Sequence, residues 1–223
     1  MTITFLELYN EVSGQPWSMY DSEAESDDDL ESALKISINK ALSYLWNLYP
    51  WSFRVTSTKI KTKSGTASYS MPDGLLTRKT ISGVQKYGVK YDGSYLTYAS
   101  DYELLDDEET GEPEQFYTEG DNIYFYPTPD NTYTINISYL LLPYGLDEDN
   151  NKIYELSSET DTINIPEKYE ALFKNCLISL AMLYAIADES DENYSGYKNQ
   201  YEDALNILLK YCNRSLTDKN IVW

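Results

Sequence analysis

Residues 42–61 read LSYLWNLYPWSFRVTSTKIK, and the spacing of their apolar side chains changes at Pro50. From Leu30 to Leu48 apolar residues recur in steps of three and four, which predicts one long helix. We expect this helix to end at Tyr49, because proline cannot continue it. After Pro50, apolar and polar residues alternate with the period of two that is typical of a strand. This switch from helix to strand indicates an α+β protein.

The rest of the chain extends this pattern in both directions. Between residues 51 and 165, short runs rich in Tyr, Thr, Ile and Val are separated by turn residues, which predicts an antiparallel sandwich or small barrel. Helical spacing returns after Pro166 and predicts two helices in an antiparallel hairpin. At the other end, Thr4 and Glu7 form a capping box for a short helix at 3–12. We therefore expect a discontinuous helical domain (1–50 and 166–213), an inserted β domain (51–165) and a C-terminal tail (214–223).

One strand of the expected β domain is unusually aromatic. Residues 120–130 read GDNIYFYPTPD, in which Gly120 and Asn122 supply the backbone angles of a tight hairpin. The following Tyr124, Phe125 and Tyr126 place rings on both faces of one strand. Both faces then need cover, either from the core of the same chain or from a neighbouring chain. We expect these three residues to lie at an interface.

The charge of the chain restricts its function. It has 37 acidic and 17 basic residues, a net charge of -20, and no histidine. Such a chain lacks the cationic footprint of a sequence-specific nucleic-acid-binding protein. The absence of histidine disfavours catalytic triads and histidine-zinc sites, although carboxylate catalysis remains open. The acid runs at 21–31 and 101–114 are expected to be solvated loops, because neighbouring carboxylates repel one another.

We expect neither a metal nor a cofactor. The loop from Asp147 begins like an EF-hand, but Lys152 stands where glycine is needed and Ser158 where the bidentate glutamate belongs. Cofactor and nucleophile motifs such as GxGxxG and GxSxG are missing, so no enzyme activity is expected. Cys176 and Cys212 lie in apolar helical patterns and are expected to be buried thiols. Neither a signal peptide nor a membrane span is expected.

The order of several motifs resembles a known family. These motifs are YPWSFR at 49–54, Y-x-M-P-x-G-L at 69–75, the aromatic stretch from Phe116 to Asp130, YLLLP at 139–143 and I-P-x-x-Y at 165–169. In this order, over residues 28–212, the chain resembles the head-to-tail adaptor proteins of short-tailed phages, also called tail tubular protein A. The acidic insertions depart from that pattern, and a crAss-like phage is an attractive candidate source.

The resemblance implies a non-enzymatic virion protein that is made in the host cytoplasm. It implies a ring of about twelve copies below the portal protein, in contact with other tail proteins. The helical part would line or brace a channel through which genomic DNA passes without specific binding, and the β domain would face outward. The resemblance also implies that the tail contacts a neighbour, with Arg214, Ile221, Val222 and Trp223 as its interface residues. The other reading is that Trp223 folds back onto the helices of its own chain, because large aromatic side chains usually find cover.

Two other functions remain open from the residues alone. The 23 tyrosines and four tryptophans also suit an aromatic-rich carbohydrate-binding module. However, such a module has no need of long helices from both chain ends. A carboxylate hydrolase is the third reading, since acids are abundant, but spacing alone identifies no catalytic pair.

Overall fold

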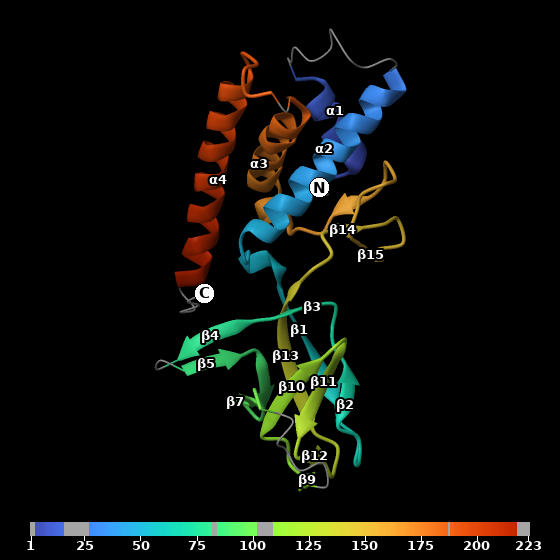
Figure 1. The fold of residues 1–223 in the computed structure, drawn as a ribbon, viewed down its shortest axis with the longest axis vertical. Coiled ribbons are helices and arrows are strands. Elements are labelled where there is room, and N and C mark those ends of the chain that lie inside the picture. The colour runs from blue at the N-terminus through green and yellow to red at the C-terminus, as the bar shows by residue number, and fades with distance from the viewer. Residues whose placement is uncertain (1–2, 16–26, 82–83, 102–108, 187, 218–223) are drawn as a thin grey trace. The chain divides into compact units, whose positions relative to one another are not determined.

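The chain forms two compact units in the computed structural model, which describes residues 3–15, 27–81, 84–101, 109–186 and 188–217 (Figure 1). Met1–Phe53 and Pro143–Asp218 form a helical unit, and Arg54–Leu142 form a β unit. Helices therefore come from both chain ends and strands dominate the middle, which confirms the predicted α+β class.

The helical unit is built around one central helix. Its helices are α1 (Phe5–Ser13), α2 (Asp27–Leu48), α3 (Glu167–Ile186) and α4 (Tyr194–Thr217). Helix α3 packs against the other three helices. By length and composition, α3 is the one helix among the described residues that could cross a membrane, but 56% of its apolar window is buried inside the protein. Its apolar character is thus that of a core helix.

The helix ends follow the chemistry expected from the sequence. The Thr4 hydroxyl accepts a hydrogen bond from the Glu7 backbone N–H at 3.1 Å, which caps α1. Helix α2 ends at Leu48, one residue before the predicted end. Trp51, just beyond the proline, folds back and donates its indole N–H to the Leu45 carbonyl at 2.7 Å. That bond satisfies one of the carbonyls that a helix end leaves without a partner.

Aromatic rings fill the centre of the helical unit. Trp46 and Trp51 are fully buried. The rings of Trp51 and Phe53 stack at 5.7 Å, and Phe53 meets Phe173 edge to face at 5.8 Å. Since aromatic rings bury large areas, this cluster holds α2, the residues after Pro50 and α3 together.

The β unit is a sandwich of two main sheets. One sheet has the order β1-β13-β6-β7, with β3 also paired to β13, and the other has the order β2-β11-β10-β8. Both sheets contribute side chains to one core, which includes Val89, Phe116, Phe125, Ile135 and Ile137. The strands of these sheets are β1 (Val55–Lys61), β2 (Ser68–Ser70), β3 (Gly74–Leu76), β6 (Val89–Tyr91), β7 (Ser94–Tyr95), β8 (Thr97–Tyr98), β10 (Gln115–Glu119), β11 (Asn122–Tyr126) and β13 (Thr134–Leu141).

Smaller strand pairs complete the β unit. Strands β4 (Arg78–Ile81) and β5 (Val84–Tyr87) form a separate hairpin. Strand β9 (Thr110–Gly111) pairs with β12 (Thr128–Pro129) in parallel, and β8 also pairs with β10 in parallel. The sequence predicted a wholly antiparallel sandwich, but these two strand pairs are parallel. Strand direction depends on how the connecting loops run, which the strand pattern alone does not give.

The boundary between the units differs from the predicted one. Residues 143–165 belong to the helical unit, where they form a small sheet of β14 (Gly145–Leu146), β15 (Lys152–Ile153) and β16 (Thr162–Ile163). Tyr144, Leu156 and Ile163 are buried in the helical core. Strand periodicity predicts an apolar face but does not say which core that face covers.

Three local expectations also need correction. Helix α4 continues to Thr217, so residues 214–217 belong to a helix and not to the tail. Helix α2 begins at Asp27, so the end of the first acid run is helical and not a loop. In the hairpin between β10 and β11, Gly120 has the left-handed angle φ +54°, whereas Asn122 does not. Residues 16–26 and 102–108, which include part of each acid run, lie outside the described residues.

Candidate interaction surfaces

A face of three tyrosines lies on the β10–β11 hairpin. Tyr117 pairs with Tyr124 across the two strands, and their rings stack at 4.7 Å with an angle of 3° between the planes. The Tyr126 hydroxyl donates a hydrogen bond to the Glu109 carboxylate. All three tyrosines are half-buried, and we call them the tyrosine face. A strand alternates its side chains, so this face points away from the core that Ile123 and Phe125 fill.

Phe125 is covered by its own unit. Its side chain is 1% exposed, and its ring lies 5.5 Å from that of Tyr69 in the β-unit core. The expectation that a neighbouring chain covers Phe125 therefore needs correction. The sequence shows three aromatic residues in a row, but it does not show that the core of the sandwich buries the middle one, Phe125. Tyr124 and Tyr126 remain candidates for an interface.

The stacking of Tyr117 on Tyr124 does not favour a sugar platform. Each ring covers one of the two faces of the other, which reduces the ring area that a sugar could stack on. Tyrosine, an aromatic ring with a polar hydroxyl group, is also a residue type that is enriched at contacts with other proteins.

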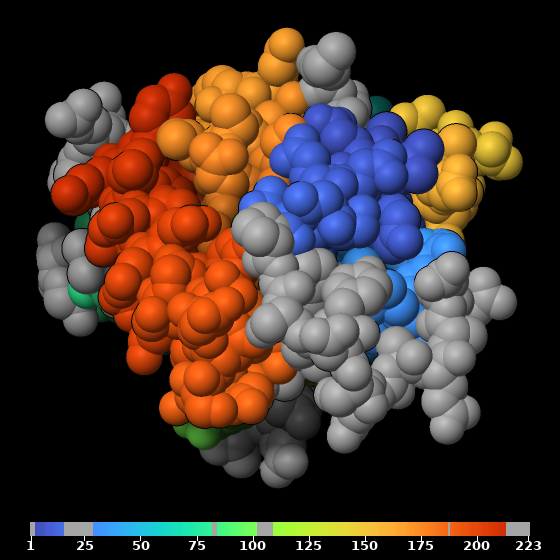
Figure 2. Space-filling model, turned by 90° about the horizontal axis from the view of Figure 1, so that it is seen from above, coloured from blue at the N-terminus to red at the C-terminus, as the bar shows by residue number. Residues whose placement is uncertain are grey.

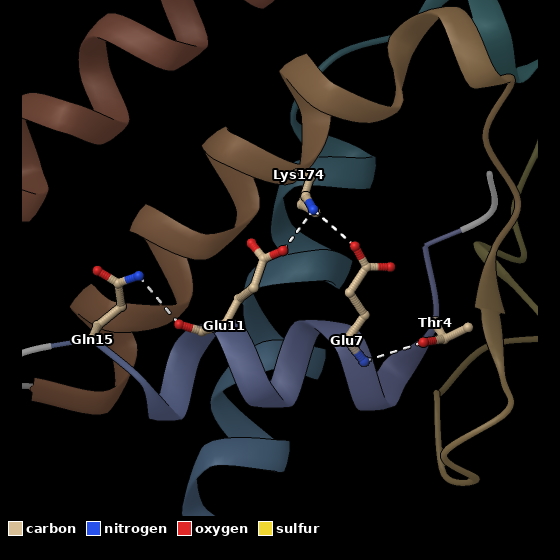
Figure 3. Close-up of polar contacts among 5 residues, drawn as sticks. All are labelled: Thr4, Glu7, Glu11, Gln15 and Lys174. Carbon is tan, nitrogen blue, oxygen red and sulfur yellow. Dashed lines mark hydrogen bonds and ion pairs between the residues drawn. The ribbon is translucent and has the colours of Figure 1, made fainter.

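A clamp of charged residues joins α1 to α3. The Lys174 ammonium on α3 lies 2.9 Å from the Glu7 carboxylate and 2.6 Å from the Glu11 carboxylate, both on α1 (Figure 3). Hydrogen bonds from Lys174 to Glu11 and Glu7 raise the pKa of the lysine. Glu7 therefore uses its carboxylate on Lys174, while its backbone N–H serves the Thr4 cap.

A groove of about 450 Å³ lies beside this clamp. Figure 2 shows this end of the helical unit, with α1 in blue and α3 and α4 in orange to red. Helices α1, α3 and α4 line the groove with polar and apolar side chains, among them Glu11, Asn175, Ile178, Tyr197, Asp203 and Ile207. The described lining holds carboxylates and amides but no lysine or arginine.

The candidate metal loop uses its first carboxylate for its own turn. Asp147 accepts hydrogen bonds from the backbone N–H groups of Asp149 and Asn151 and from the Asn151 side chain. The Asn151 side chain is the main cause that lowers the pKa of Asp147. Within the described ranges, three or more carboxylate, thiol or imidazole groups nowhere gather as they would around a metal ion.

Both thiols are buried and unreactive in character. Burial raises the pKa of Cys176 to about 12 and that of Cys212 to about 11. A thiol reacts as the thiolate, so little of either cysteine is in a reactive form at neutral pH. Both cysteines are free in the structure.

The remaining predicted interface residues cannot be placed. Ile221, Val222 and Trp223 lie outside the described residues, as does the side chain of Arg214, whose backbone belongs to the last turns of α4. Sequence reasoning missed both Lys174 and Tyr117. Lys174 is 163 residues from Glu11 along the chain, and only the strand register pairs Tyr117 with Tyr124.

Comparison with known proteins assigns the chain to a family. A search of the curated proteins finds no match. The family described as SU10 adaptor protein matches residues 3–220, and so spans both the helical unit and the β unit. Because the match covers nearly the whole chain, the protein belongs to the SU10 adaptor family of structural phage adaptor proteins.

Proposed function

We propose that this protein is a head-to-tail adaptor that forms a ring below the portal of a phage particle and extends the DNA channel for genome retention and ejection. The family match over residues 3–220 carries the proposal. Within the phage adaptors, the motifs from YPWSFR to I-P-x-x-Y favour the tail tubular protein A branch, with a crAss-like phage as the source. The protein is made in the host cytoplasm and ends in the virion, where it also contacts other tail proteins.

The charge of the chain supports a channel through which DNA slides. A net charge of -20 repels phosphates, so DNA passes such a surface without being held. A binding role toward DNA would need a cationic footprint that neutralises several phosphates.

Two regions are proposed to make protein contacts. Tyr124 and Tyr126 of the tyrosine face offer aromatic area with polar edges, and the C-terminal residues Arg214, Ile221, Val222 and Trp223 reach a neighbour or the portal. In a ring each subunit uses two different surfaces, and rotation closes the contacts without leaving a free surface.

Native mass spectrometry of the protein with its purified portal tests the proposal. We expect a weakly associated protein when it is alone, and a complex with about twelve copies when the portal is present. The repulsion between copies of charge -20 is the reason that a template is needed. A mixture that shows no complex contradicts adaptor function, and a stable ring at low salt without portal contradicts templating.

A further inference from the structure

Positive charge is concentrated in one part of an otherwise acidic chain. Residues 54–90 hold eight of the 17 basic residues and a single acidic residue, Asp73. Residues 91–142 hold twelve acidic residues and no basic one. The β unit is therefore built from a basic half and an acidic half, and the strand register decides where the basic half lies.

The register brings three lysines to one face of the five-stranded sheet. Lys59 on β1 lies opposite Asn136 on β13, Asn136 lies opposite Lys90 on β6, and Lys90 lies opposite Tyr95 on β7. Residues that pair directly point to the same side of a sheet. Ile135 and Ile137 of β13 point to the core, so Asn136 and the lysines point outward. Lys61 lies on the same side as Lys59, two residues further along β1.

Apolar side chains lie on the same side of the sheet. Val55 pairs with Leu140, which also pairs with Leu75 on β3. Leu75 is 57% exposed and Val55 is 37% exposed. We define the outer sheet face by the side chains that share this side, namely Val55, Ser57, Lys59, Lys61, Leu75, Lys90, Tyr95, Thr134, Asn136, Ser138 and Leu140.

Lys59 and Lys61, two of the three lysines of this face, are available to meet a partner, whereas Lys90 already contacts Tyr95. Lys90 lies 4.2 Å from the centre of the Tyr95 ring, and no ion pair between described residues involves Lys59 or Lys61. The outer sheet face itself contains no carboxylate. At its margin, the turn between β6 and β7 adds Asp92, which lines a hollow of about 460 Å³ together with Thr134 and Asn136.

Protection of a sheet edge explains only part of this arrangement. Lysines on an edge strand discourage pairing with another chain, and β1 is such an edge strand. However, β6 lies inside the sheet between β13 and β7, so Lys90 protects no edge. The row of charge crosses the sheet, as expected of a contact surface.

We propose that the outer sheet face docks on the acidic helical unit of a second copy of this chain. This inference rests on the proposed ring and names the surface that joins its subunits. Residues 1–53 and 143–218, the helical unit, hold 24 of the 37 acidic residues and only eight basic ones, so the two surfaces have opposite charge. They are different surfaces, as a contact that closes a ring requires.

The apolar part of the face favours protein over DNA as its partner. A phosphate backbone is charged and hydrated, so it would not bury the apolar side chains of Val55, Leu75 and Leu140. Contact with a second protein chain would remove their apolar surface from water, which is favourable. A strongly anionic chain also opposes DNA at any distance beyond direct contact.

Zero-length carbodiimide crosslinking, which joins a lysine to a carboxylate that touches it, tests the inference. A mixture of ¹⁴N- and ¹⁵N-labelled protein at high concentration distinguishes contacts between copies from contacts within one chain. We expect mixed-isotope peptides that link Lys59 or Lys61 to carboxylates of the helical unit, residues 1–53 and 143–218. In a measurement without crosslinker, sedimentation equilibrium, we also expect the double variant Lys59→Glu/Lys61→Glu to weaken self-association about tenfold, which corresponds to about 1.4 kcal/mol. The self-association of the variant Lys59→Gln/Lys61→Gln should be weaker than that of wild type and stronger than that of Lys59→Glu/Lys61→Glu.

The control is Lys198→Glu/Lys210→Glu on α4, which makes the same change in net charge at exposed positions of the other unit. We expect it not to weaken self-association, because it adds carboxylates to the helical unit on which the lysines are proposed to dock. Crosslinks from Lys59 and Lys61 that stay within one chain, or join only the portal, would overturn the inference. Tight DNA binding that the Lys59→Glu/Lys61→Glu variant abolishes would also overturn it.

The inference and the proposed function fail separately. If wild-type protein forms mixed-isotope crosslinks but does not bind the portal, the adaptor proposal is wrong and the proposed docking surface is supported. If the Lys59→Glu/Lys61→Glu variant builds the same ring on the portal as wild type, the docking surface fails and the adaptor proposal stands.

Discussion

Several deeply placed polar side chains are held by backbone atoms. Asp161 is 2% exposed, and its carboxylate accepts hydrogen bonds from the backbone N–H groups of Ser157 and Ser158 at 2.7 and 2.8 Å. Arg54 is 4% exposed and donates from Nε to the Leu141 carbonyl at 2.9 Å. Burial lowers the pKa of Arg54 to about 10, so it stays charged at neutral pH. Both side chains organise loops and strand ends, which is a structural task.

Replacement of Lys174 by methionine should loosen α1. The change removes a cation that pairs with Glu7 and Glu11 and leaves two carboxylates near each other. Because these carboxylates are partly exposed, we expect a loss of only about 1 kcal/mol in the free energy of unfolding. Urea denaturation followed by far-UV circular dichroism measures the loss. Lys198→Met, at an exposed position of α4, is the control and should cost far less.

The same variant gives a pH dependence with a definite sign. The pKa of Lys174 is raised above its ordinary value of 10.5, because its protonated form binds Glu11 and Glu7. A raised pKa means that the stabilisation is fully present below 10.5 and is lost as the pH rises through the folded-state pKa. The difference in the free energy of unfolding between wild type and Lys174→Met should therefore be constant from neutral pH to about pH 10 and should shrink above that pH. A difference that already vanishes near neutral pH would contradict this account of the clamp.

At the scale of elements, α2 is fastened to the segment that precedes α3. The Asn39 side-chain amide donates to the Leu156 carbonyl and accepts from the Leu156 backbone N–H, both at 2.9 Å. One side chain thus imitates a strand pair across 117 residues of sequence. Nearby, the Phe5 N–H donates to the Asp161 carbonyl at 2.8 Å, so the start of α1 is held by the same segment.

Asn39→Asp should weaken the contact between Asn39 and Leu156, because it changes one hydrogen-bonding group while the side chain keeps its size and shape. The new carboxylate keeps the acceptor for the Leu156 N–H but turns a lone pair toward the Leu156 carbonyl, so we expect a loss of about 1–3 kcal/mol. The matched control is Asn47→Asp on the same helix, where the amide bonds only the Ser43 carbonyl one turn away. Chemical denaturation compares the two. Equal losses in both variants would show that the contact with Leu156 contributes nothing.

Deletion of residues 218–223 should separate assembly from folding. The deletion leaves α4 intact, since that helix ends at Thr217, and removes Ile221, Val222 and Trp223. Burial of an apolar side chain at a neighbour contributes about 2 kcal/mol for each residue. We expect an unchanged thermal midpoint for the free protein and loss of ring assembly on the portal, with Trp223→Ala showing a smaller defect. A large loss of monomer stability with normal assembly would place the tail in its own fold.

Local sequence chemistry was sufficient to predict the helices and strands, but not to predict which of them contact one another. The helix from Leu30 to Leu48 and the cap at Thr4 follow from spacing and side-chain type, which act within a few residues. The assignment of residues 143–165 to the helical unit depends on which core accepts Tyr144 and Leu156, and no local rule decides that. The Lys174 clamp joins residues far apart in the chain. For the tyrosine face, the aromatic run pointed to Tyr124 and Tyr126, but the fold was needed to remove Phe125 and add Tyr117.

At the scale of the whole molecule, the charge of -20 makes a prediction about DNA. We expect binding to duplex DNA no tighter than about 1 µM at physiological salt, because few phosphates can be neutralised. Fluorescence anisotropy over a series of salt concentrations measures this, with a basic DNA-binding protein as the positive control. Tight binding that falls steeply with salt would contradict a channel surface from which DNA slides freely.

As the proposed adaptor, this chain forms the ring next to the portal. Electron cryo-microscopy of the connector isolated from virions tests it most directly, because both units of the chain have recognisable shapes, a helical unit around α3 and a two-sheet sandwich. We expect a closed ring of about twelve copies of this chain in direct contact with the portal and a DNA channel through its centre. A connector in which a different protein contacts the portal, with this chain absent or outside the channel, would contradict it.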